Sequence, residues 1–256
     1  MNFIGSAVTD VGNVKKTNQD SACVKIANSP KLVQIAMVVL CDGMGGLEKG
    51  EFASATVIRA FIHWFDEELP KLINKLSWRD FSASWEKLIK EQNFHISQYG
   101  KQIDVSLGTT VTAMLFVGGK YMIAHVGDSR AYELTDTITQ LTEDQTFIAR
   151  EIKKGTMTPE QAAKDPRRNM LLQCVGASRN VEPQMIIGDI KGDCVYLFCS
   201  DGFRHVLTNE EIYQSFHFAA IPNQIVMEQN SKVMIDLVKS RNERDNITVA
   251  LLKCSK

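Results

Sequence analysis

The sequence has almost no net charge and no long apolar run, and each absence narrows the class of protein. Its 29 Lys and Arg residues nearly balance 30 Asp and Glu residues, so the formal net charge is -1. A chain with this balance has no general attraction for nucleic acid or an anionic membrane surface. No segment approaches the roughly 18 apolar residues of a membrane-spanning helix, and the N-terminus lacks the pattern of a signal peptide. We expect a cytoplasmic protein with no nucleic-acid or membrane partner.

Paired cysteines are also absent. The six cysteines are scattered without a C-x-x-C pair, and most of them lie inside apolar runs. This spacing argues against a disulfide framework and against a zinc site. We expect buried free thiols in a reducing compartment.

Nothing in the chain marks a domain boundary, because proline-rich linkers, low-complexity tracts and internal repeats are missing. With 44% apolar and 23% charged residues, the 256 residues fall in the ordinary globular range and can bury one core. We expect a single domain over residues 1–256, and a monomer.

The chain does contain many short apolar segments bounded by turn residues. They are rich in β-branched residues and some are apolar throughout, which is typical of strands buried between layers. These segments cover residues 4–9, 21–27, 33–41, 110–117, 121–126, 131–134, 185–190, 195–199 and 247–252.

Three other segments have the helical period, near residues 51–69, 85–96 and 223–239. The Gly118-Gly119 pair between two strand segments is typical of a hairpin. Helices that follow such strand pairs favour antiparallel sheets covered by helices. The sequence therefore predicts an α+β fold with a layered antiparallel β-sandwich.

Residues 143–179 differ from the rest because they are polar and charged and contain Gly155 and two prolines. Within them, Thr158 and Pro159 suit the cap and first turn of a short helix. We expect a small flap-like insertion on the sandwich, and a candidate for substrate selection, since loops beside a rigid site usually provide it. Its basic residues Arg167 and Arg168 are either a solvated face or a contact for an acidic or phosphorylated substrate.

Carboxylates at the ends of apolar strands are the most informative pattern. Asp42-Gly43 follows one apolar run and Asp201-Gly202 follows another. Each pair alone is usually a plain turn, but a further glycine pair and a long helix after the first one favour a site. Clustered carboxylates in a buried cleft need cations, and hard oxygen ligands indicate magnesium or manganese rather than zinc.

Six motifs resemble signatures of the protein phosphatase 2C family of metal-dependent serine/threonine phosphatases, most closely its small bacterial members. Each motif is weak alone, but all six occur in the family's order and roughly its spacing. They are GNVKKTNQD at 12–20, DGMGG at 42–46, LGTT at 107–110, AHVGDSRAY at 124–132, SDG at 200–202 and RDNIT at 244–248. The resemblance implies a central β-sandwich flanked by helices on both faces, in agreement with the periodicity.

Carried over to the matching positions, the resemblance implies hydrolysis of phosphoserine and phosphothreonine by a metal-activated water. It implies two Mn²⁺ or Mg²⁺ ions bridged by Asp42, one of them completed by Asp201 and Asp245. The carbonyl of Gly43 and waters complete the other ion, and Asp20 belongs to the shell that holds them. Such a site attacks the phosphoryl group in line without a covalent intermediate, so no nucleophilic cysteine is required.

Several positions depart from the family's common pattern or support the site indirectly. Lys15 stands where an arginine usually binds the substrate phosphate, and it keeps the charge without the bidentate fork. Gln19 replaces a glutamate and so removes one negative charge near the metals. Asn246 is expected to set the geometry beside Asp245.

A third metal ion is left open. Bacterial members often place an aspartate four residues after the one matched by Asp201, and it contributes to a third ion together with the one matched by Asp128. Here that position is His205. A third site at Asp128 either survives with altered affinity or metal choice, or is lost.

Two alternatives to an active protein phosphatase remain. One is a catalytically weak scaffold that binds a phosphoprotein partner, suggested by Lys15, Gln19 and His205. The other is a metal-dependent phosphoesterase that acts on small molecules. The retained aspartates favour an enzyme, because a pure scaffold has no need of a destabilising carboxylate cluster. The expected substrate is a phosphorylated protein, and the resemblance implies that the enzyme opposes a serine/threonine kinase.

Overall fold

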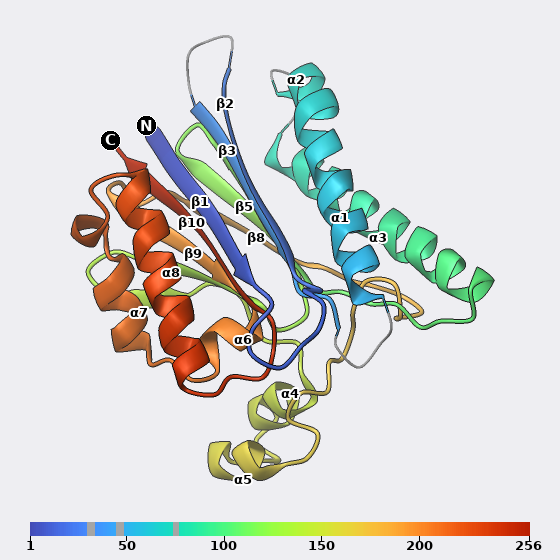
Figure 1. The fold of residues 1–256 in the computed structure, drawn as a ribbon. Helices are drawn as coiled ribbons and strands as arrows, with labels where there is room; N and C mark the ends of the chain where they lie inside the picture. Colours follow the sequence, from blue (N-terminus) through green and yellow to red (C-terminus); the bar gives the residue numbers. More distant parts are fainter. Residues whose placement is uncertain (30–33, 45–48, 74–76) are drawn as a thin grey trace.

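The computed structural model describes residues 1–29, 34–44, 49–73 and 77–256. Its strands form two five-stranded antiparallel sheets that pack face to face (Figure 1). The strand order is β1-β10-β9-β6-β7 in one sheet and β2-β3-β4-β5-β8 in the other. The predicted α+β sandwich is confirmed.

The strands follow the apolar segments closely. The first sheet contains β1 (Asn2–Asp10), β6 (Arg130–Leu134), β7 (Ile138–Gln140), β9 (Cys194–Cys199) and β10 (Ile247–Ser255). The second contains β2 (Ser21–Asn28), β3 (Gln34–Cys41), β4 (Val111–Val117), β5 (Lys120–Val126) and β8 (Gln184–Asp189). The expected start of β3 at residue 33 lies outside the described residues. Only β7 was not predicted, because its three residues include a single apolar one.

Helices cover both outer faces of the sandwich (Figure 1). Against the second sheet lie α1 (Gly50–His63) and α3 (Trp78–Gln102), and against the first lie α7 (Asn209–Phe216) and α8 (Gln224–Ser240). The helix predicted over residues 51–69 is not a single α-helix. The α-helical part ends at His63, a π-helical turn follows at Trp64–Glu68, and α2 (Leu69–Leu72) comes after it. A 3₁₀ turn at Phe218–Ala220 precedes α8. Sequence periodicity missed α7, because only Ile212 and Phe216 of its eight residues are buried.

Three hydrophobic layers hold these elements together, and single strands contribute to two of them. In β9, Tyr196 and Phe198 pack between the two sheets, whereas Leu197 packs under α7 and α8. In β3, Val38 faces the other sheet and Val39 faces α1 and α3. Burial on both faces explains why these strands are apolar throughout instead of alternating with polar residues.

The segment at residues 143–179 contains α4 (Phe147–Lys153) and α5 (Pro159–Lys164), which project from one end of the sandwich (Figure 1). As predicted, Thr158 caps α5 through a bond from the Gln161 N–H to its hydroxyl. The chain then returns beside the sandwich, where Thr109 and Val175 exchange backbone hydrogen bonds of 3.0 and 2.9 Å. The segment therefore ends next to the loop that follows α3.

All six cysteines are free thiols; Cys23 is half-buried and the other five are buried. The expectation of buried free thiols is thus met at every position but one. Among the described residues, no helix is long and apolar enough to cross a bilayer.

The core between the sheets makes a direct prediction for stability. Phe116 is fully buried there, and we expect Phe116→Ala to lower the free energy of unfolding by about 3–5 kcal/mol through lost burial and an unfilled cavity. Phe94 on α3 is 60% exposed, so Phe94→Ala is the matched control and should change stability by less than about 0.5 kcal/mol. Urea unfolding measures both, and equal losses would contradict this packing.

Candidate active site

The registers of the two sheets bring five aspartates to one end of the sandwich. The last residue of β3 pairs with the first residue of β2, so Asp42 and Asp20 lie beside each other. The last residue of β9 pairs with the first residue of β6 and, on its other side, with β10. This pairing brings Asp201, Asp128 and Asp245 to the same end, although they are far apart in the sequence.

Electrostatics place Asp42 at the centre of the group. Burial is the main cause that raises the pKa of its carboxyl well above the usual range, and the other four aspartates add to the effect in the order Asp20, Asp201, Asp128 and Asp245. Burial also raises the pKa of Asp20 and of Asp128 to about 7, with a further contribution from Asp201 in both cases. Desolvated carboxylates that repel one another are stabilised by a cation placed between them.

The loop that follows α3 holds the backbone of Asp42. The Thr110 N–H donates to the Asp42 carbonyl at 2.8 Å, and the Thr110 hydroxyl accepts from the Asp42 N–H at 2.9 Å. The Thr109 hydroxyl donates to the same carbonyl at 2.9 Å. These bonds fix the main chain and leave the carboxylate of Asp42 free of ion pairs with described residues.

Asp201 lies on a helical turn, not in the open turn that its glycine neighbour suggests. It is the first residue of α6 (Asp201–Arg204), where a carboxylate is favoured by the helix dipole. Gly202, the second residue of this turn, is required by packing. A Cβ at Gly202 would lie 2.1 Å from the carbonyl oxygen of Asn246, so glycine allows two backbone segments to meet.

Gly43 serves the same purpose on the other side of the site. A Cβ there would lie 2.3 Å from the Gln19 carbonyl oxygen and 2.7 Å from that of Gly50. Both neighbours are backbone atoms and cannot swing aside. Glycine at this position therefore lets the start of α1 and the loop before β2 close against the residue that follows Asp42.

Asn246 ties the loop between β1 and β2 to the site. Its side-chain oxygen accepts from the Gln19 N–H at 2.9 Å, and its side-chain nitrogen donates to the carbonyls of Val11 and Thr17 at 2.9 and 3.1 Å. Its own N–H donates to the Asp245 carboxylate at 2.8 Å. The side chain of Asn246 therefore positions the neighbouring loop, and its contact with Asp245 is made by the backbone N–H.

Three other residues predicted on that loop are Lys15, Gln19 and Asp20. The Lys15 Nζ lies 2.8 Å from the Asp245 carboxylate. The carboxylate of Asp20, which is almost completely buried, accepts from the Thr248 hydroxyl at 2.6 Å. The Gln19 side-chain amide instead donates to Glu51 on α1 at 3.3 Å.

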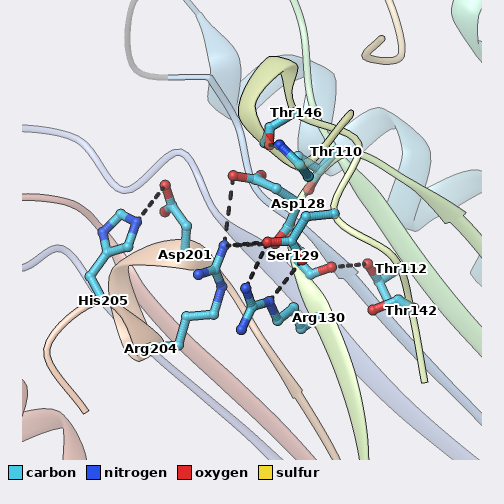
Figure 2. A network of polar contacts seen from close by, with 12 residues as sticks. Thr110, Thr112, Asp128, Ser129, Arg130, Thr142, Thr146, Asp201, Arg204 and His205 are labelled. Atoms are coloured by element: carbon cyan, nitrogen blue, oxygen red, sulfur yellow. Dashed lines mark hydrogen bonds and ion pairs between the residues drawn. The ribbon is translucent and has the colours of Figure 1, made fainter. Parts of the chain in front are cut away.

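Two cationic side chains that were not predicted, Arg130 and Arg204, lie near Asp128 (Figure 2), and both pair with Asp144. Arg204 donates to the Asp128 carbonyl at 3.2 Å, and its Nη2 lies 3.8 Å from the Asp128 carboxylate and 3.5 Å from that of Asp144. Arg130 holds Asp144 through a bidentate pair at 2.8 and 2.7 Å. Arg130 belongs to a recognised motif, but no pattern marks Arg204 or Asp144.

His205 lies on the other side of Asp201 from Asp128 (Figure 2). Its Nε2 is 3.6 Å from the Asp201 carboxylate, and its Nδ1 is 3.5 Å from that of Glu243. Glu243 was also missed, and it accepts from the N–H groups of Arg244 and Asp245. The structure thus brings His205 to Asp201 and not to Asp128.

The aspartates open into a cleft between the sandwich and the flap-like segment. One part has a volume of about 460 Å³ and is lined by Lys15, Asp42, Asp201 and residues 169–174, which return from the flap. The adjoining part, of about 700 Å³, lies between α5 and the loop before β10 and shares Lys15, Asp128 and Asp245 with the first. The acidic centre is therefore reached through a groove large enough for an extended peptide.

A family model described as protein phosphatase 2C matches residues 13–237. The chain belongs to the protein phosphatase 2C family. It is a domain of the serine/threonine protein phosphatase type, a class of hydrolases, and the predicted family is confirmed.

Relatives and solved structures agree with this assignment. The serine/threonine protein phosphatase PstP of Mycobacterium tuberculosis is 30% identical over 249 residues, which are 96% of this chain and 44% of PstP. This chain thus spans less than half the length of that relative. The Streptococcus agalactiae serine/threonine phosphatase superposes with a TM-score of 0.85 at 26% identity, covering 99% of this chain and all of the other. The PstP catalytic domain in complex with two manganese ions has a TM-score of 0.77 at 29% identity, covering 99% of each chain.

The donor set of this phosphatase 2C domain fits the hard divalent cations of its metal-dependent family. Carboxylate oxygens at the cleft are the ligands that Mg²⁺ and Mn²⁺ prefer. Within the described ranges, no three His, Cys, Asp or Glu side chains lie together as a group that could hold a metal ion. The fit therefore rests on the chemistry of the donors, since the carboxylates of four other aspartates act on Asp42.

The role of Asn246 in this phosphatase 2C domain can be tested without an activity assay. Asn246→Ala should remove the hydrogen bonds to the carbonyls of Val11 and Thr17, lower the free energy of unfolding by about 1–2 kcal/mol, and loosen the loop that carries Lys15. Trypsin should then cleave after Lys15 or Lys16 faster than in the wild type. The exposed Asn180 makes no side-chain hydrogen bond with described residues, so Asn180→Ala is the control. Unchanged cleavage in Asn246→Ala would exclude this tether.

Proposed function

We propose that this chain is an active, metal-dependent protein phosphatase that hydrolyses phosphoserine and phosphothreonine. The convergence of five aspartates on a cleft is the observation that carries the proposal. The central one, Asp42, has no cationic partner among the described residues. A folded protein that keeps such a cluster needs cations there, and divalent cations at a cleft are suited to phosphoryl transfer.

The proposed ligand roles follow the family pattern. Asp42, Asp201 and Asp245 would hold the ions through their carboxylates. Gly43 would add its carbonyl oxygen, and Asp20 would support the Asp42 side of the site. When bound, two Mn²⁺ or Mg²⁺ ions would supply a water of lowered pKa as nucleophile and neutralise charge on the phosphoryl group.

The protein's own residues hold and orient the substrate. Lys15 is partly exposed at the rim of the cleft, where its ammonium group pairs with Asp245. We infer that it turns from this carboxylate to a phosphoryl oxygen when substrate binds. Because an ammonium group acts as a point charge, Lys15 would attract the phosphate without imposing the two-point geometry of an arginine.

The walls of the cleft support a peptide substrate with acidic neighbours. In the flap, Arg167 is occupied, since it pairs with Asp165 and lies over the Phe147 ring at 4.0 Å. Arg168, the next residue, lines the 700 Å³ part of the cleft, and Arg244 lines it from the loop before β10. Neither side chain forms an ion pair with the described residues. Arg167 therefore stabilises the flap, whereas Arg168 and Arg244 form a cationic surface that would face the substrate.

The two alternatives receive less support. A scaffold that only binds phosphoprotein would not need five clustered carboxylates, three of which are desolvated and repel one another. A phosphoesterase for small molecules would not need a groove that continues past the metal ligands to Arg168 and Arg244. Opposition to a serine/threonine kinase rests on the family resemblance. The single domain, the monomer and the cytoplasmic location stay predictions.

Metal dependence tests the central claim. Asp201→Asn should lower turnover of an aryl phosphate and of a phosphothreonine peptide by more than about 100-fold, because even partners outside the metal's ligands are worth 10–100-fold. Chelation should abolish wild-type activity and Mn²⁺ should restore it. The exposed Asp136 is distant from the site, so Asp136→Asn is the control and should keep full activity. Metal-independent turnover would exclude the mechanism, and metal binding without any turnover would favour the scaffold.

Substrate selection by the cleft walls is tested with two variants. Arg168→Ala and Arg244→Ala should each lower kcat/KM by about 2–5-fold for a phosphothreonine peptide with acidic flanks, as expected for exposed charge pairs. Activity toward an aryl phosphate should not change, because it does not reach these walls. Arg59 is exposed on α1 outside the cleft, so Arg59→Ala is the matched control. Equal losses for acidic and neutral peptides would count against a charge-selective surface.

A further inference from the structure

The position beside Asp128 is occupied by a side chain that carries a positive charge. The Arg204 Nη2 lies 3.2 Å from the Asp128 carbonyl oxygen and 3.8 Å from its carboxylate. The same nitrogen lies 3.5 Å from the carboxylate of Asp144. A single guanidinium group thus connects the acidic site to a second carboxylate behind it.

This guanidinium group is held in place and shielded from solvent. Only 14% of the Arg204 side chain and 11% of the Asp128 side chain are exposed, so salt screens the pair weakly. Arg130 fixes Asp144 from the opposite side through its bidentate pair. Arg204 also follows Asp201 by three residues on α6, a spacing that puts the two side chains on one face of the turn.

A divalent ion at Asp128 does not fit these neighbours. His205, the residue at the position expected to complete such a site, is turned toward Asp201 and Glu243. Position 205 therefore adds no carboxylate beside Asp128. A divalent ion would also lie next to the positive charge of Arg204, which cannot be removed by deprotonation in a protein.

We propose that Arg204 is a built-in counter-cation, whose guanidinium group takes the place beside Asp128 that a third divalent ion would need. This inference rests on the proposed two-metal site and adds that the chain binds two ions and not three. The negative charge of Asp128 is then partly balanced whether or not metal is bound. Arg204 acts through Asp128 and is a positioning residue.

Metal stoichiometry tests the proposal without an activity assay. Mn²⁺ is titrated into the metal-free full chain by calorimetry, and free Mn²⁺ is counted by electron paramagnetic resonance. The wild type should bind two ions, and His205→Asp should also bind two because the guanidinium still blocks the place. The double variant Arg204→Met with His205→Asp should bind three. Arg179 is exposed and lies outside the acidic site, so Arg179→Met with His205→Asp is the matched control and should bind two.

Each other outcome overturns the inference. A third ion in the wild type or in His205→Asp would show that the guanidinium blocks nothing. A double variant that gains no ion over His205→Asp would show that Arg204 is only a structural ion pair. Circular dichroism checks folding, and Arg204→Gln replaces Arg204→Met if that variant unfolds, since it removes the charge but keeps a donor. If the proposed function is wrong, the wild type would bind no Mn²⁺, which differs from every outcome above. The difference in bound ions between the double variant and His205→Asp would still test the role of Arg204.

Discussion

Repulsion among buried carboxylates is the constraint on which the rest of this structure depends. Asp42 lies among four other aspartates at a desolvated end of the sandwich, and each of them disfavours ionisation of its carboxyl group. A flexible protein would relieve this repulsion by separating the loops. The fold must hold the aspartates together until cations bind. This requires, first, that the strand ends from which the loops begin are rigid and, second, that the loops pack tightly against one another.

The sandwich meets the first requirement through strands that are buried on both faces. Strands such as β3 and β9 contribute alternate side chains to two hydrophobic layers, so the ends that carry Asp42 and Asp201 cannot shift without disturbing both. The second requirement is met by backbone contact. Gly43 and Gly202 let neighbouring main chains approach more closely than a Cβ would allow, and Asn246 bonds to three points of one loop.

The aspartates of the cluster differ in whether a cationic side chain of the protein lies beside them. Asp245 pairs with Lys15, Asp128 with Arg204, and Asp201 contacts the imidazole of His205. Asp42 has no such partner in the described part of the chain. Asp245 and Asp128 are thus partly balanced by cationic side chains, while Asp42 and Asp20 have no cationic partner among the described residues and depend on bound cations. In this arrangement, the carboxylates that most need bound cations lie where a phosphoryl group would be attacked.

The sequence by itself predicted the sandwich and the aspartates at strand ends. Strands buried on both faces require continuous apolar runs, and close approach of two backbones requires glycine, so both features can be recognised in a single sequence. Its family motifs also identified Lys15 and Asn246. Only the tertiary structure decided that Arg204 lies beside Asp128, that His205 turns to Glu243, and that Asp201 begins a helical turn. These ion pairs join residues brought together by strand register across large sequence separations. Such pairing between distant side chains produces no periodic pattern and no unusual residue composition, so the sequence does not predict it.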